Sequence, residues 1–411
     1  MEKKLDGKTV VLGLQHTFVM FGSTVLVPLI TGLDVGVTLF AAGIGTWLFH
    51  ILTKFKVPVF LGSSFAFIPP ILAITAETGD IAYATGGILI AGLMYVIVSV
   101  IFKFVSYDAL HKILPPSVTG PMIILIGMML ANVAISNANG TYSAGVVEKI
   151  GVNGAWGIAL FTFAVAVIIK TAFKGFITAL PVLIALIAGY ILSIILGVTD
   201  FSNVASAAWV GFPGFMLPKF AAGAIMMTVP IALVTMVEHF GDVLAIGNVV
   251  DEDFIKDPGI HRTLLGDGLA TSLSAFMGGP ANTTYSENTG AVALTGVKDP
   301  VVMRIAAIFA IVLSLIPKFT AIIGSIPGPV IGGISILLFG MISSIGIKNM
   351  VDAKVDLTLP SNLMITAAML VLGIGGATFT VGSLSLSGLG LAAIVGILLN
   401  VILNFKSFKK A

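Results

Sequence analysis

Long apolar runs recur from one end of the 411-residue chain to the other, and they constrain its fold more than any other feature of the sequence. Only 10% of the residues are charged, whereas a typical soluble domain carries about 25%. So few charges cannot cover the surface of a water-soluble globule. The sequence therefore excludes a soluble enzyme, a nucleic-acid binder and a disordered scaffold, and it predicts a polytopic membrane protein.

The apolar runs are long enough to be membrane-spanning helices, because a bilayer core of about 30 Å needs roughly 20 apolar residues per helix. They are continuous rather than alternating, which favours helices over a β-barrel. The sequence predicts fourteen spans in two sets of seven. The first set covers 9–31, 35–53, 58–75, 81–105, 117–137, 154–172 and 176–198, and the second covers 221–247, 262–278, 285–296, 301–322, 327–345, 361–374 and 386–405.

The basic residues of the connecting loops fall almost entirely on one side of this topology. If the N-terminus is cytoplasmic, 18 of the 21 Lys and Arg residues lie inside, and only Lys149, Lys219 and Lys318 lie outside. Cytoplasmic loops of membrane proteins carry such an excess of positive charge. We therefore expect an even number of spans, with both termini in the cytoplasm and the chain in an inner (plasma) membrane.

Two predicted spans, the third of each set, contain residues that break a helix. The segment 58–75 carries three prolines among Gly and Ser residues, and the residues before 285–296 read Gly278-Gly-Pro-Ala-Asn-Thr-Thr284. Corresponding Gly/Pro-interrupted segments in the two halves of a transporter point to its binding site. Because each set holds an odd number of helices, the second set would be inverted relative to the first. The expected fold is thus an all-α bundle with a 7+7 inverted repeat and short extended stretches in spans three and ten.

Very few acidic residues fall inside the predicted spans. Glu238 and Asp242 lie in the eighth span, Asp267 near the inner end of the ninth, and Glu287 at the start of the tenth. A carboxylate at membrane depth costs several kcal/mol (roughly 3 on insertion scales) and marks a functional site by default. Glu238 and Asp242 are four residues apart and share a helix face, so their mutual repulsion favours capture of a proton near neutral pH.

For several of these polar residues, a purely structural role stays open as an alternative to a functional one. Glu238 could be a buried acid tied to a helix end, and Asp242 could be a hydrogen-bond acceptor behind the site. Asp267 is expected to be structural or interfacial. His239 is expected to pack between helices, because it points about 100° away from Glu238. His16, inside the first span, must face the protein interior and is a candidate site residue.

The polar stretch 281–290 is expected to bind a small ligand. A broken span leaves free N–H groups at the start of a half-helix, and these can donate to carbonyl oxygens while a carboxylate accepts N–H protons. Phe65 and Tyr285 would add a flat face, so the pocket suits a planar, neutral, amide-like molecule. An anion transporter or channel would need Lys or Arg at that depth, and the predicted spans place none there. With no Cys and no nucleophile–base or metal-ligand spacing, neither an enzyme nor a cofactor is expected.

Several motifs, in order along nearly the whole chain, resemble those of the nucleobase–ascorbate transporter family, the xanthine/uracil permeases. They are Leu14-Gln-His16, Phe21-Gly-Ser-Thr-Val-Leu-Val-Pro28, Leu61-Gly-Ser-Ser-Phe-Ala-Phe67, Val237-Glu-His-Phe-Gly241, Asp257-Pro-Gly-Ile-His-Arg262, Asn282-Thr-Thr-Tyr-Ser-Glu-Asn288 and Ile331-Gly-Gly-Ile-Ser-Ile-Leu-Leu-Phe-Gly340. Within the family, the likeness is greatest to the bacterial uracil branch.

This resemblance implies a core domain (1–115 with 201–323) and a gate domain (116–200 with 324–411). In spans three and ten, a short strand and a half-helix would meet near the midplane, where the nucleobase binds. The implied activity is uracil import by proton symport and alternating access, in a homodimer that contacts lipid and no nucleic acid. A xanthine/urate or other purine permease is the alternative within the family.

The resemblance also implies roles for individual residues. Glu238 would accept from the pyrimidine N–H and Glu287 would hold the pocket, while the backbone amides of Phe65 and Ser286 donate to carbonyl oxygens and Tyr285 and Ser64 complete the substrate site. Glu238, Asp242 and His16 would carry the coupled proton. Glu287 favours the uracil branch, because purine-type members tend to have Gln there. Two positions depart from that branch: Asp242 replaces His, as in purine and urate members, and Phe339 replaces Tyr. The purine alternative, and Na⁺ as the coupling ion, therefore stay open.

Overall fold

The computed structural model describes residues 7–104, 114–381 and 384–404. Six of the Lys residues predicted to be cytoplasmic lie outside the described residues: Lys3, Lys4, Lys112, Lys406, Lys409 and Lys410. The helices are α1 (Gly7–Thr31), α2 (Val35–Leu52), α3 (Ile68–Thr78), α4 (Ala82–Phe102), α6 (Pro116–Met129), α7 (Ala131–Ala138), α8 (Ala144–Ala172), α9 (Pro181–Ile195), α10 (Ser202–Ser206), α11 (Ala222–Val250), α12 (Ile260–Phe276), α13 (Ser286–Thr295), α14 (Pro300–Ser314), α15 (Pro317–Gly324), α16 (Gly328–Asp352), α17 (Pro360–Ile374) and α18 (Gly388–Leu403). Shorter elements are the helical turns η1 (Phe65–Phe67), η2 (Gly175–Ala179) and η3 (Ile255–Gly259), and the strands β1 (Leu61–Ser63), β2 (Asn282–Thr284), β3 (Thr378–Val381) and β4 (Leu384–Ser387).

The helices follow the predicted apolar segments closely. In the described residues, 7 helices are long and apolar enough to cross a membrane, counting α6 with α7 as one, and the pair α14 and α15 would make up to 8. The helices α9, α17 and α18, and the stretch formed by η1 and α3, are apolar but shorter. Each of the fourteen predicted segments coincides with helical residues. The count of fourteen spans and the 7+7 repeat stay predictions.

The structure departs from the predicted segments in three places. The segment 301–322 is bent by 87° between α14 and α15, because Pro317 excludes the helical conformation at Ile316 (φ −115°, ψ 84°). Helix α8 begins ten residues before the predicted 154, since Ala144 starts it, and it kinks at Gly151 (φ 70°). The antiparallel hairpin β3–β4, with Thr378 paired to Ser387, occupies the start of the segment predicted as 386–405.

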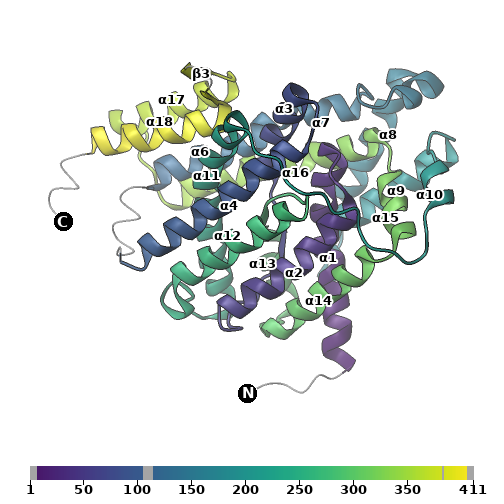
Figure 1. Cartoon of the computed structure of the whole chain (residues 1–411), viewed down its shortest axis with the longest axis horizontal. Helices are drawn as coiled ribbons and strands as arrows, with labels where there is room; N and C mark the ends of the chain where they lie inside the picture. The colour runs from purple at the N-terminus through teal and green to yellow at the C-terminus, as the bar shows by residue number, and fades with distance from the viewer. Residues whose placement is uncertain (1–6, 105–113, 382–383, 405–411) are drawn as a thin grey trace.

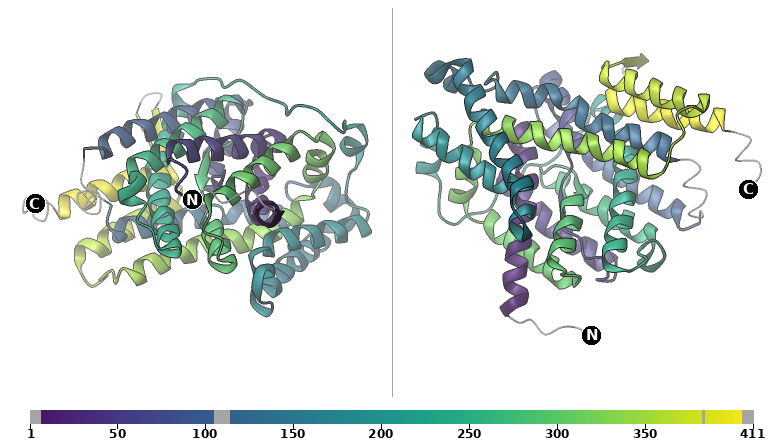
Figure 2. Two further views of the ribbon diagram at one scale, coloured as in Figure 1. Left: turned by 90° about the horizontal axis from the view of Figure 1, so that it is seen from below. Right: turned by 180° about the vertical axis from the view of Figure 1, so that it is seen from behind.

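The bundle is elongated, with α8, α9 and α10 at one end of its long axis and α17 and α18 at the other (Figures 1 and 2). Helix α12 packs against α2 and α4, and α14 packs against α1 and α2. Helix α16 packs against α6, α7 and α8. The first group comes from the predicted core segments and the second from the predicted gate segments, while the division into two domains stays a prediction.

The crossing of α4 and α12 depends on two glycines that face each other. A Cβ atom built on Gly92 would lie 2.7 Å from the carbonyl oxygen of Gly268, and one built on Gly268 would lie 2.8 Å from the carbonyl oxygen of Gly92. Small residues let helices approach this closely inside membranes. The contact holds α12, which carries Asp267, firmly against α4.

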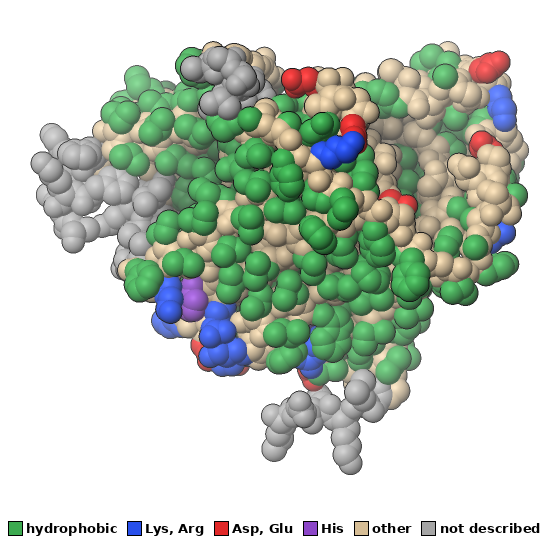
Figure 3. Space-filling model, viewed as in Figure 1, with side chains coloured by type: hydrophobic (Ala, Val, Ile, Leu, Met, Phe, Trp, Pro, Cys, Tyr) green, Lys and Arg blue, Asp and Glu red, His purple; other side chains and the backbone are tan. Residues whose placement is uncertain are grey.

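The surface of the bundle is mostly apolar. On the face shown in Figure 3, hydrophobic side chains cover the broad middle, and Lys, Arg and His side chains gather along the lower edge. Large apolar side chains point outward on the helices, as Ile97 and Val100 do on α4, each 56% exposed. Exposed apolar surface on this scale suits a helix bundle surrounded by lipid.

Candidate substrate-binding site

The two broken spans meet in the middle of the bundle. Strands β1 and β2 pair antiparallel, with Leu61 opposite Thr284, Gly62 opposite Thr283 and Ser63 opposite Asn282. Strand β1 leads through η1 into α3, and β2 leads directly into α13. Prolines 69 and 70 fall in the first turn of α3, where a helix needs no N–H donor. The expectation of a short strand and a half-helix in spans three and ten is thus confirmed.

Buried side chains of the neighbouring helices hold the two strands in place. The backbone N–H of Leu61 donates to Thr46 Oγ1 at 2.9 Å, and Thr271 Oγ1 donates to the carbonyl of Asn282 at 2.8 Å. The Asn282 amide in turn donates to the carbonyl of Ala41 at 3.2 Å. These bonds satisfy irregular backbone at membrane depth, which lipid could not do. Sequence reasoning missed these anchors, since Thr46 and Thr271 look like ordinary small residues of apolar helices.

A cavity of about 500 Å³ opens beside the strands. Its inner lining combines carboxylates, hydroxyls and aromatic rings from α11 and the two broken spans: Phe65, Glu238, Asp242, Thr283, Thr284, Tyr285 and Glu287. From there the cavity extends to Lys348 and Asp352 at the exposed end of α16, which form an ion pair. The structure therefore brings together five of the predicted site residues.

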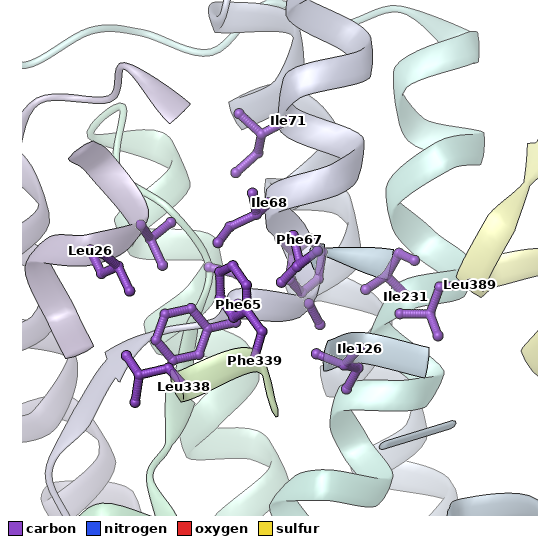
Figure 4. Close-up of a cluster of buried hydrophobic side chains, with 14 of the residues drawn as sticks. Leu26, Phe65, Phe67, Ile68, Ile71, Ile126, Ile231, Leu338, Phe339 and Leu389 are labelled. Atoms are coloured by element: carbon purple, nitrogen blue, oxygen red, sulfur yellow. The ribbon is translucent and has the colours of Figure 1, made fainter. Parts of the chain in front are cut away.

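Two aromatic rings stand almost parallel at the inner end of the cavity. The planes of Phe65 and Tyr285 differ by 10°, and their ring centres lie 6.3 Å apart. The Tyr285 hydroxyl donates to the carbonyl of Ser63 at 2.6 Å, which fixes its ring against β1. Phe65 meets Phe339 of α16 edge to face, with ring centres 5.9 Å apart. Figure 4 shows this contact continuing into apolar side chains, among them Leu338, so the site is sealed on that side.

The turn η1, which leads into α3, and the first turn of α13 both reach the cavity, through Phe65 and Glu287. The positive end of a helix dipole and its free N–H groups lie at the N-terminus, where they favour oxygen atoms of a ligand. Glu287 lies in the first turn of α13, directly after Ser286. The roles of the Phe65 and Ser286 amides as donors to a substrate stay predictions.

Two predicted site residues do not reach the cavity. The backbone N–H of Ser64 donates to the carbonyl of Ala281 at 2.9 Å, and its buried hydroxyl has no partner in the described part of the chain. His16 is fully buried between α1 and α13, with its Nε2 atom 3.5 Å from Thr295 Oγ1. Neither side chain lines the cavity. The predicted roles of both residues therefore gain no support from their positions.

A buried polar cluster lies behind the cavity, and sequence reasoning did not connect its members. Asp267 is fully buried, so of the two expected positions, structural or interfacial, the structure agrees with the structural one. Its Oδ2 atom lies 3.3 Å from His239 Nδ1. The Thr284 hydroxyl lies 3.4 Å from the same nitrogen and donates to Asp242 Oδ2 at 3.0 Å. An acidic residue between two glycines in an apolar helix was the available signal for a buried, closely packed position.

Comparison with known proteins agrees with these features. The chain matches the sequence profile of the Permease family over residues 7–382. The uracil permease of Bacillus caldolyticus is 42% identical over 408 residues, which cover 97% of this chain and 92% of that protein. The probable uracil permease of Pasteurella multocida (strain Pm70) is 44% identical over 399 residues, covering 96% and 94%. These relatives are permeases, which are transporters and not enzymes.

A solved structure supports the fold. The transmembrane domain of the cyanobacterial bicarbonate transporter BicA superposes with a TM-score of 0.66, at 15% identity, over 96% of this chain and 97% of that one. At this identity the likeness concerns the fold alone. Together with the apolar helices, the family match implies a multi-pass membrane protein. Since the profile spans most of the chain and the relatives match over nearly their full length, the chain belongs to the Permease family, that of the xanthine and uracil permeases.

Proposed function

We propose that this protein imports uracil across the plasma membrane by proton symport. The names of its relatives point to uracil, and one observation in the structure carries the proposal. Two carboxylates, Glu238 and Glu287, line the same cavity as two nearly parallel rings, at the η1 turn that leads into α3 and at the start of α13. This combination of acceptors, donors and flat faces matches the chemistry of a nucleobase.

Uracil is a flat ring that presents N–H donors between carbonyl acceptors. Glu238 accepts a hydrogen bond from a ring N–H, and Glu287 helps to hold the base. The amides of Phe65 and Ser286 donate to the carbonyl oxygens. Glu287 stands where purine-type members of the family tend to have Gln, which favours uracil over a purine.

The charges around the cavity argue against an anion as substrate. Among the described lining residues of this cavity, Lys348 is the one cation, and it pairs with Asp352 at the exposed end. The inner end carries the carboxylates of Glu238, Asp242 and Glu287 instead. A negatively charged ligand there would meet the repulsion of these carboxylates. The anion-transporter alternative, which the fold alone would allow, is therefore disfavoured.

Transport would proceed by alternating access. The cavity reaches Lys348 and Asp352, at the end of α16 that the loop charges predict to be cytoplasmic, and this supports an inward-facing conformation. The contact between Phe65 and Phe339 closes the opposite side. Movement of the core segments against α16 would break that contact and open the site outward. A homodimer formed through the gate segments is part of this proposal, as the family resemblance implies.

A binding panel on purified protein tests the substrate. We expect uracil to raise the midpoint of thermal unfolding more than thymine, xanthine, urate or hypoxanthine at equal concentration, because a ligand that binds only the folded state stabilises it. In proteoliposomes at constant Na⁺, a protonophore should collapse uracil uptake. A larger shift with xanthine or urate would replace uracil by the purine alternative, and uptake that follows Na⁺ instead would overturn the proton symport.

A further inference from the structure

A carboxylate–imidazole pair lies one layer behind the cavity and has no place in substrate binding. His239 on α11 and Asp267 on α12 face each other with 3.3 Å between Nδ1 and Oδ2. Both side chains are 0% exposed, and neither lines the cavity. Within the described residues, Nε2 of His239 has no hydrogen-bond partner, and Phe49 packs edge-on against the ring.

The charge of this pair depends on one proton. With a neutral imidazole and an ionised carboxylate, the pair carries one negative charge in the protein interior, where Asp267 forms no ion pair with a Lys or Arg of the described chain. Burying an uncompensated charge costs several kcal/mol. One added proton makes the pair neutral, either as imidazolium and carboxylate or as imidazole and carboxylic acid. The site is therefore built to hold a proton.

The surrounding groups strengthen this preference. On the elements packed around the pair, the other titratable or charged groups are Tyr83 and Tyr95 of α4, His50 of α2, Glu238 and Asp242 of α11, Glu287 of α13, and His261 and Arg262 of α12. Arg262 donates to the carbonyl of Leu52, and Tyr95 donates to Thr235 Oγ1 at 2.6 Å. The acids lie on the cavity side, so their negative charges add to the cost of an unprotonated pair.

A hydroxyl connects the pair to the cavity. Asp242 lines the cavity and accepts from Thr284 Oγ1 at 3.0 Å, and the same oxygen lies 3.4 Å from His239 Nδ1. A hydroxyl can accept one proton and release its own. A proton from cavity water can thus bind the Asp242 carboxylate, pass through the Thr284 hydroxyl and stay on the His239–Asp267 pair. Release follows the same route in reverse, and only O–H and N–H bonds form and break.

We propose that the His239–Asp267 pair is the proton-binding site that couples transport, with Thr284 as its link to the cavity through Asp242. This inference rests on the proposed proton symport and names the residues that bind the coupled proton. Loading the pair removes a negative charge near Glu238, so Glu238 can stay ionised to accept from a nucleobase. All four residues of the route, Asp242, Thr284, His239 and Asp267, belong to predicted core segments, so the proton would travel with the substrate.

The test separates binding from coupling in Asp267→Asn. Because Asp267 does not line the cavity, we expect uracil binding and uracil–uracil exchange in proteoliposomes to stay within about threefold of wild type, less than 1 kcal/mol. Uphill accumulation driven by a pH gradient should be lost, and Asp267→Glu should restore part of it. The matched control is Asp80→Asn, the same change at a half-buried aspartate paired with Lys219, which should keep both activities. Uphill accumulation by Asp267→Asn at the wild-type level would overturn the proposal.

A second measurement does not need uracil. The infrared bands of a protonated carboxylic acid (the C=O stretch) and of histidine (the imidazole ring modes), followed against pH in ligand-free protein, should lose or shift one titrating component in Asp267→Asn and change its midpoint in His239→Gln. If Asp267→Asn does not fold, His239→Gln alone carries this test. Identical titrations in wild type and variants would overturn the assignment, as would displacement of the band by Na⁺, which would make the pair a sodium site. If the band behaves as expected but a protonophore leaves uracil uptake by the wild-type protein unchanged, the proposed proton symport is contradicted instead.

Discussion

The two broken spans share one backbone design. In each, a strand of three residues pairs with its counterpart and leads into a half-helix, of 11 residues in α3 and 10 in α13. Each half-helix ends at a glycine in the left-handed conformation, Gly79 (φ 70°) and Gly296 (φ 66°). Only a residue without a side chain adopts this conformation at no cost, which is why glycine is common at helix C-termini.

The ends of the two spans are tied down in matching ways. Just after Gly79, Asp80 pairs with Lys219 at 2.7 Å, shortly before α11 begins. Just after Gly296, Lys298 pairs with Asp251 at 2.8 Å, directly after α11 ends. The segments that follow the two half-helices thus form ion pairs beside the opposite ends of the same helix, α11.

The chemistry of the two spans differs. From Leu61 to Ala76 the first span carries no charged residue, and it contributes Phe65 and backbone to the cavity. The second contributes Thr284 and Glu287, which bring a hydroxyl and a carboxylate. One span therefore shapes the site, and the other, together with α11, supplies its charge. Selectivity and coupling are expected to respond to changes in the second span and in α11 far more than to changes in the first.

Removing charge should have the largest effect. We expect Glu238→Gln and Glu287→Gln each to weaken uracil binding by roughly 10- to 150-fold, because a hydrogen bond to a charged group contributes about 1.5–3 kcal/mol. In Glu287→Gln, selectivity should also shift toward xanthine. Titration calorimetry on purified protein measures both. Glu77→Gln, the same change on the exposed end of α3, is the control. Unchanged uracil affinity in Glu238→Gln would contradict the view that α11 and the second broken span supply the charge of the site.

Adding one methyl group to the first span should have the next largest effect, through packing. A Cβ atom on Gly62 would collide with the Tyr285 ring and lie 2.8 Å from Thr24 Oγ1. We expect Gly62→Ala to cost about 1–3 kcal/mol of stability, typical of overpacking, and to displace Tyr285 from the site. Thr283, opposite Gly62, can lose its side chain, so Thr283→Ala should cost less. Equal thermal unfolding midpoints for the two variants would show that the paired strands are interchangeable after all.

Releasing the ends of α11 should have the smallest effect. The Lys219 ammonium beside Asp80 lowers the pKa of that carboxyl, and Lys298 does the same for Asp251. A lowered pKa in the folded state stabilises the fold above the unfolded-state value, which is about 3.9, and the gain is lost as pH falls through the folded-state pKa. Asp80→Asn and Lys298→Met should therefore lower the unfolding midpoint slightly and similarly at pH 7, and this difference from wild type should shrink as the pH falls below about 3.9. High salt should remove the difference, because both pairs are exposed. Unequal effects of the two variants would show that one end of α11 is held differently.

Much of the architecture was predictable because membrane helices depend mainly on the length of apolar runs. The positions of Pro69, Gly278 and Pro280 predicted the broken spans, and the isolated acids Glu238 and Glu287 indicated the candidate site. Periodicity could not reveal the partner of each acid. Whether Asp267 faces lipid, a helix or His239 depends on the rotation of α12 against α11, which packing sets and the apolar pattern does not.

Other features depend on contacts between distant segments. The register that places Gly62 opposite Thr283 comes from anchors such as Thr46 and Asn282, and the bend before Pro317 depends on a residue that many helices tolerate at their first turn. The position of His16 away from the cavity could not be read from its neighbour Gln15. Resemblance to a family identified the residue types needed for the site, but not which of them touch.

The facing glycines of α4 and α12 restrict how this protein can change. A new side chain at Gly92 or Gly268 would collide with the main-chain oxygen of the opposite glycine, among other atoms. A second substitution cannot remove this collision, because every residue has a main-chain oxygen. A search for suppressors of either replacement should thus return nothing from the contacting residues. Variants with greater heat resistance have to come from elsewhere, for instance from lipid-facing positions such as Ile97 and Val100 on the same helix.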